Sequence, residues 1–293
     1  MWYYALAHQP AKVREVMNLL ISYSLVQSTV FPPDEDVDDH LGRLLNDRNA
    51  TLEQFAKQDL EAADLVGKML SGYATLRKFY ETRDDETIPL ARRRAEAARA
   101  IAAVIASADD NIRGGLYDAT RDAVVSEDFL LVLLGEALVL VRPGDGAAGA
   151  TSQPVISLDT IDVLLKAVED IQTVGGRVYA ACDEFFQLVL RSAPGGLKGS
   201  TPADLMRKST SSLGGAGGSY VLSGSSLLAS QLHRSLSASS GGGLAKAAAR
   251  RGWDWRSGLN ATTTAADVLK AIRLGLSREL ARLWVAEADG DLW

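Results

Sequence analysis

The sequence is poor in the residues that build disulfide and metal sites. Its 293 residues include one cysteine, Cys182, and three histidines, His8, His40 and His233. A disulfide within the chain is therefore impossible, and a structural zinc centre, which usually takes four Cys or His ligands, is not expected. We expect neither a metal nor any other cofactor in this fold.

Long hydrophobic runs and alternating strand patterns are also lacking. The most apolar run, Phe129–Val141, contains Glu136 and is shorter than the roughly 20 apolar residues that a membrane-spanning helix needs. Aromatic residues make up 6% of the chain, and Ala, Leu, Arg and Glu are abundant, which favours helix over strand. The sequence predicts an all-α fold without a transmembrane segment, with Phe129–Val141 as a buried helix.

The charge balance argues against two classes of ligand. The net charge is −6, so the chain repels a phosphate backbone on average, and we do not expect nucleic acid as a partner. The acidic run Asp34–Asp39 resembles the start of a calcium-binding EF-hand loop. That loop requires glycine at its sixth position and glutamate at its twelfth, where this chain has Asp39 and Leu45. A solvated helix start is the preferred interpretation of the run.

Catalytic motifs are missing as well. Sites of the Ser–His–Asp or Cys–His type need a histidine base, but His40 lies in the acidic run and His233 in a Ser/Gly-rich stretch. No G-x-S-x-G, P-loop or H-E-x-x-H motif occurs. Cys182 lies among apolar neighbours and is predicted to pack in the core. We expect no enzymatic activity and no small-molecule substrate; an all-helical enzyme that uses His8 is the alternative of that class.

Apolar residues recur at helical spacing through the first 191 positions. Ser126 and Ser157 precede such patterns and have acidic residues after them, as N-cap residues do. Thr51–Gln54 has the form of a capping box, and Ser71–Gly72 interrupts the pattern that follows, which predicts two antiparallel helices there. Further helices are predicted over residues 10–30, 88–106, 111–125, 127–141, 158–173 and 177–191.

The stretch 192–258 differs in composition from the rest of the chain. It holds 13 of the 26 glycines and 15 serines, with two acidic and eight basic residues. Because so little apolar surface cannot offset the entropy of ordering, we predict a mostly disordered insertion, whose serines near basic residues are candidate kinase targets. Its end mixes cations with Trp253 and Trp255. That mixture fits either a short binding motif or a linker whose tryptophans pack onto the helices.

Helical patterning returns after the insertion. Thr264–Asp267 is a second capping-box pattern, and the apolar stripe of the helix that follows is expected to pack near residues 158–173. The sequence therefore predicts three parts. They are an α-helical solenoid over residues 1–191, the insertion over 192–258, and a C-terminal helix over 259–293 that packs back on the solenoid.

Four segments are similar, in order, to a known family. Val155–Ile171 and Val268–Arg282 resemble its closing helices, Phe129–Val141 resembles the helix before them, and Gly72–Tyr80 is similar more loosely. The family is the eighty-five-kilodalton nucleoporin, a scaffold subunit of the Y-shaped coat of the nuclear pore. The resemblance implies an all-helical fold of stacked antiparallel helix pairs, related to vesicle-coat subunits.

The resemblance also implies a location and partners. The location is the nuclear pore complex at the nuclear envelope, where the coat supports nucleocytoplasmic transport and mRNA export. The implied partners are the Sec13-carrying nucleoporin and the long-arm nucleoporin near the hub of the Y. The family's first segment, which completes a β-propeller partner, has no counterpart here, so residues 1–10 are expected to lie inside a longer protein. The insertion is also unlike the compact members of the family.

A structural scaffold that works through apolar helix faces is thus the predicted function. The alternative is a helical-repeat adaptor of another assembly, such as a vesicle coat or a lid-type complex. The predicted partner-binding residues lie on two helices: Ile161, Leu165 and Val168 on the first, and Leu269, Ile272, Leu276, Leu280, Leu283 and Trp284 on the last.

Overall fold

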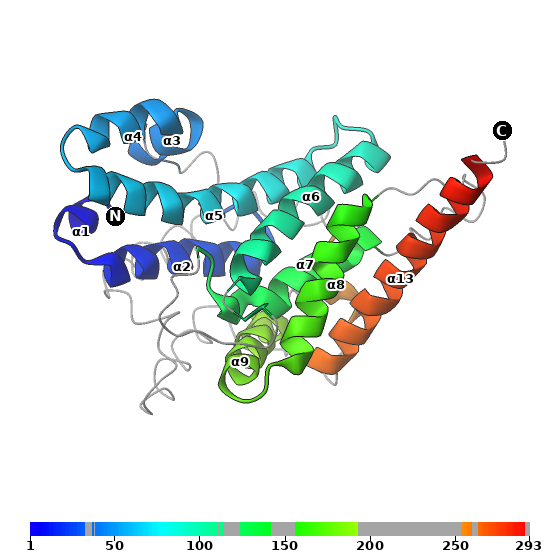
Figure 1. The fold of residues 1–293 in the computed structure, drawn as a ribbon. Coiled ribbons are helices and arrows are strands. Elements are labelled where there is room, and N and C mark those ends of the chain that lie inside the picture. The colour runs from blue at the N-terminus through cyan, green and yellow to red at the C-terminus, as the bar shows by residue number, and fades with distance from the viewer. Residues whose placement is uncertain are drawn as a thin grey trace. The chain divides into compact units, whose positions relative to one another are not determined.

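In the computed structural model, all the regular elements of the described residues are helices, joined by turns and short connections (Figure 1). It describes residues 1–32, 37, 39–110, 112–113, 124–141, 156–192, 253–259 and 263–290. Most of the acidic run, of the predicted helix over 111–125 and of the predicted insertion lies outside these residues. For the described residues the predicted all-α solenoid class is confirmed, and none of the described helices combines the length and the apolarity that crossing a bilayer requires.

The chain divides into two compact units, of which the first contains residues 1–77. Its helices are α1 (Trp2–Leu6), α2 (Pro10–Gln27), α3 (Asp39–Asn46), α4 (Arg48–Ala56) and the larger part of α5 (Leu60–Asp84). Pro10 occupies the first turn of α2, where its missing N–H has no helical partner to lose. The α2 helix ends at Ser28, which has a left-handed φ of 50°. Beyond it, the Tyr73 hydroxyl of α5 donates to the Phe31 carbonyl at 2.6 Å.

The helix boundaries between residues 47 and 84 differ from the prediction. Thr51 does not cap a helix but lies inside α4, where its hydroxyl donates to the Asp47 carbonyl at 2.9 Å. The cap belongs to Asp59, whose carboxylate accepts the Ala62 N–H at 2.9 Å at the start of α5. The predicted break at Ser71–Gly72 is wrong, because α5 runs through it without interruption. A glycine inside a helix costs only about 1 kcal/mol relative to alanine, less than the burial of the neighbouring apolar side chains contributes.

The second unit holds residues 78–190 and 253–293. Its helices are α6 (Leu90–Asp109), the 3₁₀ turn η3 (Glu127–Phe129), α7 (Leu130–Val141), α8 (Leu158–Thr173), α9 (Arg177–Ser192), the 3₁₀ turn η6 (Trp255–Gly258) and α13 (Ala265–Gly290). The predicted N-caps are confirmed, since Ser126 accepts the Asp128 N–H and Ser157 accepts the Thr160 N–H. The capping box of α13 is confirmed too, with Thr264 and Asp267 bonded in both directions.

The apolar helix α7 lies at the centre of the second unit. Its residues are almost all buried, and α6, α8 and α13 all pack against it. Arg94, near the start of α6, donates from Nε to the carbonyl of Leu140 near the end of α7 at 3.1 Å, so these two helices run antiparallel. A cation on the last carbonyls of a helix also satisfies acceptors that have no partner within it.

Candidate partner-binding surface

The predicted partner-binding residues divide into two groups. Five of them are buried inside the second unit: Ile161, Val168, Leu269, Ile272 and Leu276. They hold α8 and α13 against each other and against α7, and the expected packing of α13 near α8 is thereby confirmed. At the edge of this contact, Arg273 of α13 donates to the Gln172 amide oxygen at 2.5 Å. The other four, Leu165, Leu280, Leu283 and Trp284, are at least partly exposed.

The last turns of α13 carry the accessible apolar residues. The side chain of Trp284 is 63% exposed and that of Val285 is 56% exposed. In a helix with 3.6 residues per turn these residues share one side with Leu274, Ala281 and Ala288, opposite the buried stripe. We call these five residues the distal α13 face. The red end of α13 in Figure 1 extends away from α6, α7 and α8.

Cations flank the distal α13 face. Arg273 and Arg278 are exposed beside it. Arg282 is half-buried and pairs with the buried carboxylate of Glu279, one turn earlier on α13. An apolar helix side with basic neighbours fits a partner helix that is apolar at its centre and acidic at its rim.

A glycine lets α13 approach α7 closely. A Cβ built on Gly275 would lie 2.7 Å from Cγ2 of Val141 and 3.4 Å from its carbonyl oxygen. We expect Gly275→Ala to lower the free energy of unfolding by about 1–3 kcal/mol, because the added methyl forces the two helices apart. Urea titration followed by circular dichroism measures the change. Gly175→Ala is the matched control, since a Cβ there meets nothing within 4 Å; equal midpoints for the two variants would contradict this close contact.

The end of the predicted insertion, residues 253–258, contains an anchor on the helices of the second unit. Trp255 is fully buried at 0% exposure and stacks on Phe186 of α9, with ring centroids 5.9 Å apart. Its indole lies against Gly135 of α7, where an added Cβ would come within 2.9 Å of the ring. The 3₁₀ turn η6, which begins at Trp255, therefore packs against α7. For Trp255 the second sequence interpretation, a tryptophan packed onto the helical body, is the one observed.

Charged side chains next to this anchor form a buried cluster. Arg83 is 1% exposed and donates from Nη1 to Oε2 of Glu136, which is 0% exposed, at 3.0 Å. The Tyr80 hydroxyl donates to the other oxygen of Glu136 at 3.1 Å, and Arg83 also binds Asp84 at 2.9 Å. Burial, together with the Glu136 charge, raises the pKa of Tyr80 well above its usual value. Burial alone would lower the pKa of Arg83, but the carboxylates of Glu136 and Asp84 raise it.

The contacts in this cluster could not be predicted from the sequence, because the residues that meet are more than 50 positions apart. Glu136 was noted only as an interruption of an apolar run, and Arg83 lies in a polar helix end. Since the charges are shielded from water, removal of one partner would leave the other buried without compensation.

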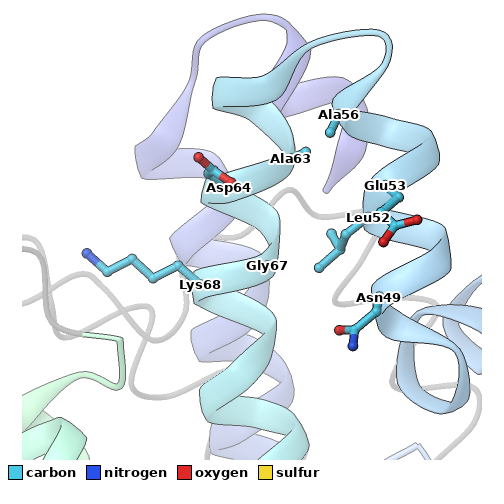
Figure 2. A pocket seen from close by; sticks show the side chains of 8 residues that line it. All are labelled: Asn49, Leu52, Glu53, Ala56, Ala63, Asp64, Gly67 and Lys68. Carbon is cyan, nitrogen blue, oxygen red and sulfur yellow. The ribbon is translucent and has the colours of Figure 1, made fainter.

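A small groove lies between α4 and α5 in the first unit (Figure 2). Its volume is about 420 Å³, and Leu52 of α4 fills part of it, because its Cδ1 lies 3.0 Å from the position of a Cβ on Gly67. Figure 2 shows Ala56 and Ala63 at one end and Asn49 at the other. The lining residues are Asn49, Leu52, Glu53, Ala56, Ala63, Asp64, Gly67 and Lys68. None of them was a predicted site residue, and they include no nucleophile paired with a base.

Cys182 and His8 are the two residues weighed above for a catalytic role, and the structure shows what surrounds each of them. Cys182 is buried, as predicted, and its thiol donates to the Glu127 carbonyl at 3.0 Å. Burial and the nearby Asp128 raise the pKa of this thiol, which makes it a poor nucleophile. His8 lies exposed in the turn after α1, with φ of 51°. Among the described side chains, no group of three or more His, Cys, Asp and Glu is placed to hold a metal ion.

Comparison with known proteins identifies the relationship. The chain is 61% identical to "Nucleoporin NUP85" of Chaetomium thermophilum over 300 aligned residues, which include 100% of this chain. The chain is a close relative of nucleoporin NUP85. It spans 25% of the length of NUP85, at the C-terminal end, so the predicted resemblance is confirmed. No family model and no solved structure matches the chain.

Proposed function

We propose that the chain is a scaffold element of the outer-ring, Y-shaped coat of the nuclear pore complex and binds neighbouring coat nucleoporins through helix surfaces. The observation that carries this proposal is the 61% identity to NUP85 along the whole chain. It is supported by the all-helical fold of the described residues and by the exposed apolar side chains at the end of α13. Support of nucleocytoplasmic transport and mRNA export belongs to the same proposal, as does localisation at the nuclear envelope.

The distal α13 face is the surface that we assign to a coat partner. Its tryptophan and valine are exposed, whereas the stripe on the opposite side of α13 is used within the unit. Tryptophan is among the residues that contribute most to protein interfaces, and the flanking arginines select an acidic rim on the partner. The proposed partners are the Sec13-carrying nucleoporin and the long-arm nucleoporin near the hub of the Y.

Replacing the exposed pair tests this surface. Trp284→Glu with Val285→Glu is expected to weaken partner binding by about 2 kcal/mol or more, roughly thirtyfold in Kd, because a central aromatic anchor is lost and charge is added. Co-purification with coat nucleoporins identifies the partner. Titration of the unchanged chain and of the variant with that partner then gives the change in Kd. Thermal unfolding of the variant chain should change little, since both side chains are exposed.

The matched control is Leu60→Glu. Leu60 is also a highly exposed apolar residue, but it lies at the start of α5 in the first unit. It should leave recovery of the partners unchanged. If the Trp284/Val285 variant recovers as much partner as Leu60→Glu does, the assignment of the distal α13 face is contradicted.

The location of the tagged full-length protein separates the proposal from its alternative. A punctate nuclear rim is expected for a pore scaffold. Cytoplasmic puncta would instead favour an adaptor of a vesicle coat or of a lid-type complex.

A further inference from the structure

Glu279 is the last buried residue that the structure describes on α13. Its side chain is 1% exposed, whereas every described residue after it on this helix is partly or fully exposed. Gly275, one turn earlier on the same side of α13, lies close to Val141 at the end of α7. Glu279 therefore marks the point where α13 leaves the second unit.

The carboxylate of Glu279 holds Arg282, one turn further along α13. Nη1 of Arg282 donates to Oε1 of Glu279, and the side chain of Arg282 is 39% exposed. The other oxygen of Glu279, Oε2, is buried and accepts no hydrogen bond from the described residues. Breaking the pair would leave a buried carboxylate without its donor, which is costly. The pair therefore fixes the Arg282 side chain, although part of that side chain reaches solvent.

A second cation, Arg94 of α6, lies at the same end of the unit. Its guanidinium donates to the carbonyl of Leu140 at the end of α7. Burial lowers the pKa of Arg94, and the negative charge of Glu279 opposes that effect. Arg94 thus offsets part of the cost of burying Glu279, while the hydrogen bond from the carboxylate side goes to Arg282.

Arg282 lies between the buried stripe of α13 and the distal α13 face. It is three residues from Glu279 and three residues from Val285, so it neighbours both on the helix surface. A guanidinium has several N–H donors in a planar fork, so donors remain for a carboxylate on a partner. An arginine that is already held in place also loses less conformational entropy on binding than a freely moving one.

We propose that Glu279 is a positioning residue for partner binding, which holds Arg282 beside the distal α13 face so that its guanidinium meets an acidic side chain of the partner helix. The inference rests on the proposed function, which assigns this face to a coat partner. Arg278 is exposed beside the same face, and no ion pair joins it to a described carboxylate. Arg278 is therefore the matched comparison for Arg282.

NMR of the arginine Nε–H groups tests the positioning in the chain without a partner. In the unchanged chain the Nε–H group of Arg282 should have a higher order parameter than that of Arg278. In Glu279→Leu, which removes the acceptor, the Arg282 value should fall to about 0.6 or below, the range of flexible groups. The Arg278 value should be the same in both proteins. If Glu279→Leu does not fold, Glu279→Gln, which keeps the shape and removes the charge, takes its place.

Titration with the coat nucleoporin that co-purifies with the unchanged chain tests the consequence for binding. Arg282→Gln should raise Kd about tenfold, because a positioned arginine at the interface is lost. Glu279→Leu should raise Kd about threefold, the effect of having to order one long side chain on binding. In the Arg282→Gln background Glu279→Leu should cause no further rise, because Glu279 acts through Arg282. In the Arg278→Gln background it should still cause the threefold rise.

Two outcomes would overturn the positioning role. One is an Arg282 Nε–H group that is as mobile in the unchanged chain as in Glu279→Leu. The other is a rise in Kd from Glu279→Leu that is as large without Arg282 as with it, since that effect would be structural. Failure of the proposed function looks different. In that case Trp284→Glu with Val285→Glu would bind like the unchanged chain, while the NMR result for Arg282 would stand.

Discussion

Arg83→Ala is expected to lower the free energy of unfolding by about 3–5 kcal/mol, one of the two largest effects that the structure predicts. The substitution leaves the carboxylate of Glu136 buried at 0% exposure without its cation. It also removes a guanidinium that lies 4.8 Å from the ring centroid of Tyr80. Most of the cost comes from the uncompensated charge rather than from the lost attraction, because desolvating a carboxylate is expensive. Chemical denaturation at pH 7 measures the change.

Two comparisons separate this explanation from a general effect of losing arginine. Arg92→Ala removes an arginine that pairs with Glu96 on the exposed side of α6, and should cost at most about 0.5 kcal/mol. The double variant Arg83→Met with Glu136→Leu removes both charges and should recover most of the stability lost in Arg83→Ala. A double variant as unstable as the single one would show that shape, and not charge, makes the cluster important.

The helices were predictable where a side chain fixes their start. Ser157 and Thr264 cap α8 and α13 through hydrogen bonds between neighbours in sequence, so the local pattern contains the information. The break expected at Ser71–Gly72 was wrong because burial on either side of the glycine outweighs its weak helix propensity. That burial depends on residues distant in sequence, which local spacing does not reveal.

The candidate surface was predictable only in part, for a similar reason. An apolar stripe has the same spacing whether it faces a neighbouring helix or a partner, so Ile272 and Leu276 could not be told apart from Trp284. The structure separates them by burial. For Trp255 the sequence left two interpretations open, because the contacts that bury it come from α7 and α9 and not from its neighbours in sequence.

Trp255→Ala is expected to destabilise the second unit by about 3–5 kcal/mol, since it removes a fully buried indole and leaves a cavity beside Gly135 and Phe186. The same change at an exposed tryptophan, Trp284→Ala, is the matched control and should alter stability by no more than about 0.5 kcal/mol. Urea unfolding of both variants gives the difference. Equal midpoints would contradict the role of Trp255 as an anchor.

The cavity in Trp255→Ala also allows a complementation test. Free indole has the shape of the missing ring, and apolar cavities in protein cores bind ligands of matching size. At ten times its Kd, indole should restore about 1.4 kcal/mol of stability to Trp255→Ala by mass action. It should leave Trp284→Ala unchanged, because that substitution opens no enclosed site. Recovery in Trp255→Ala alone would mean that the helices keep the indole site when the side chain is absent. In that case residues 253–259 occupy a site that α7 and α9 already form.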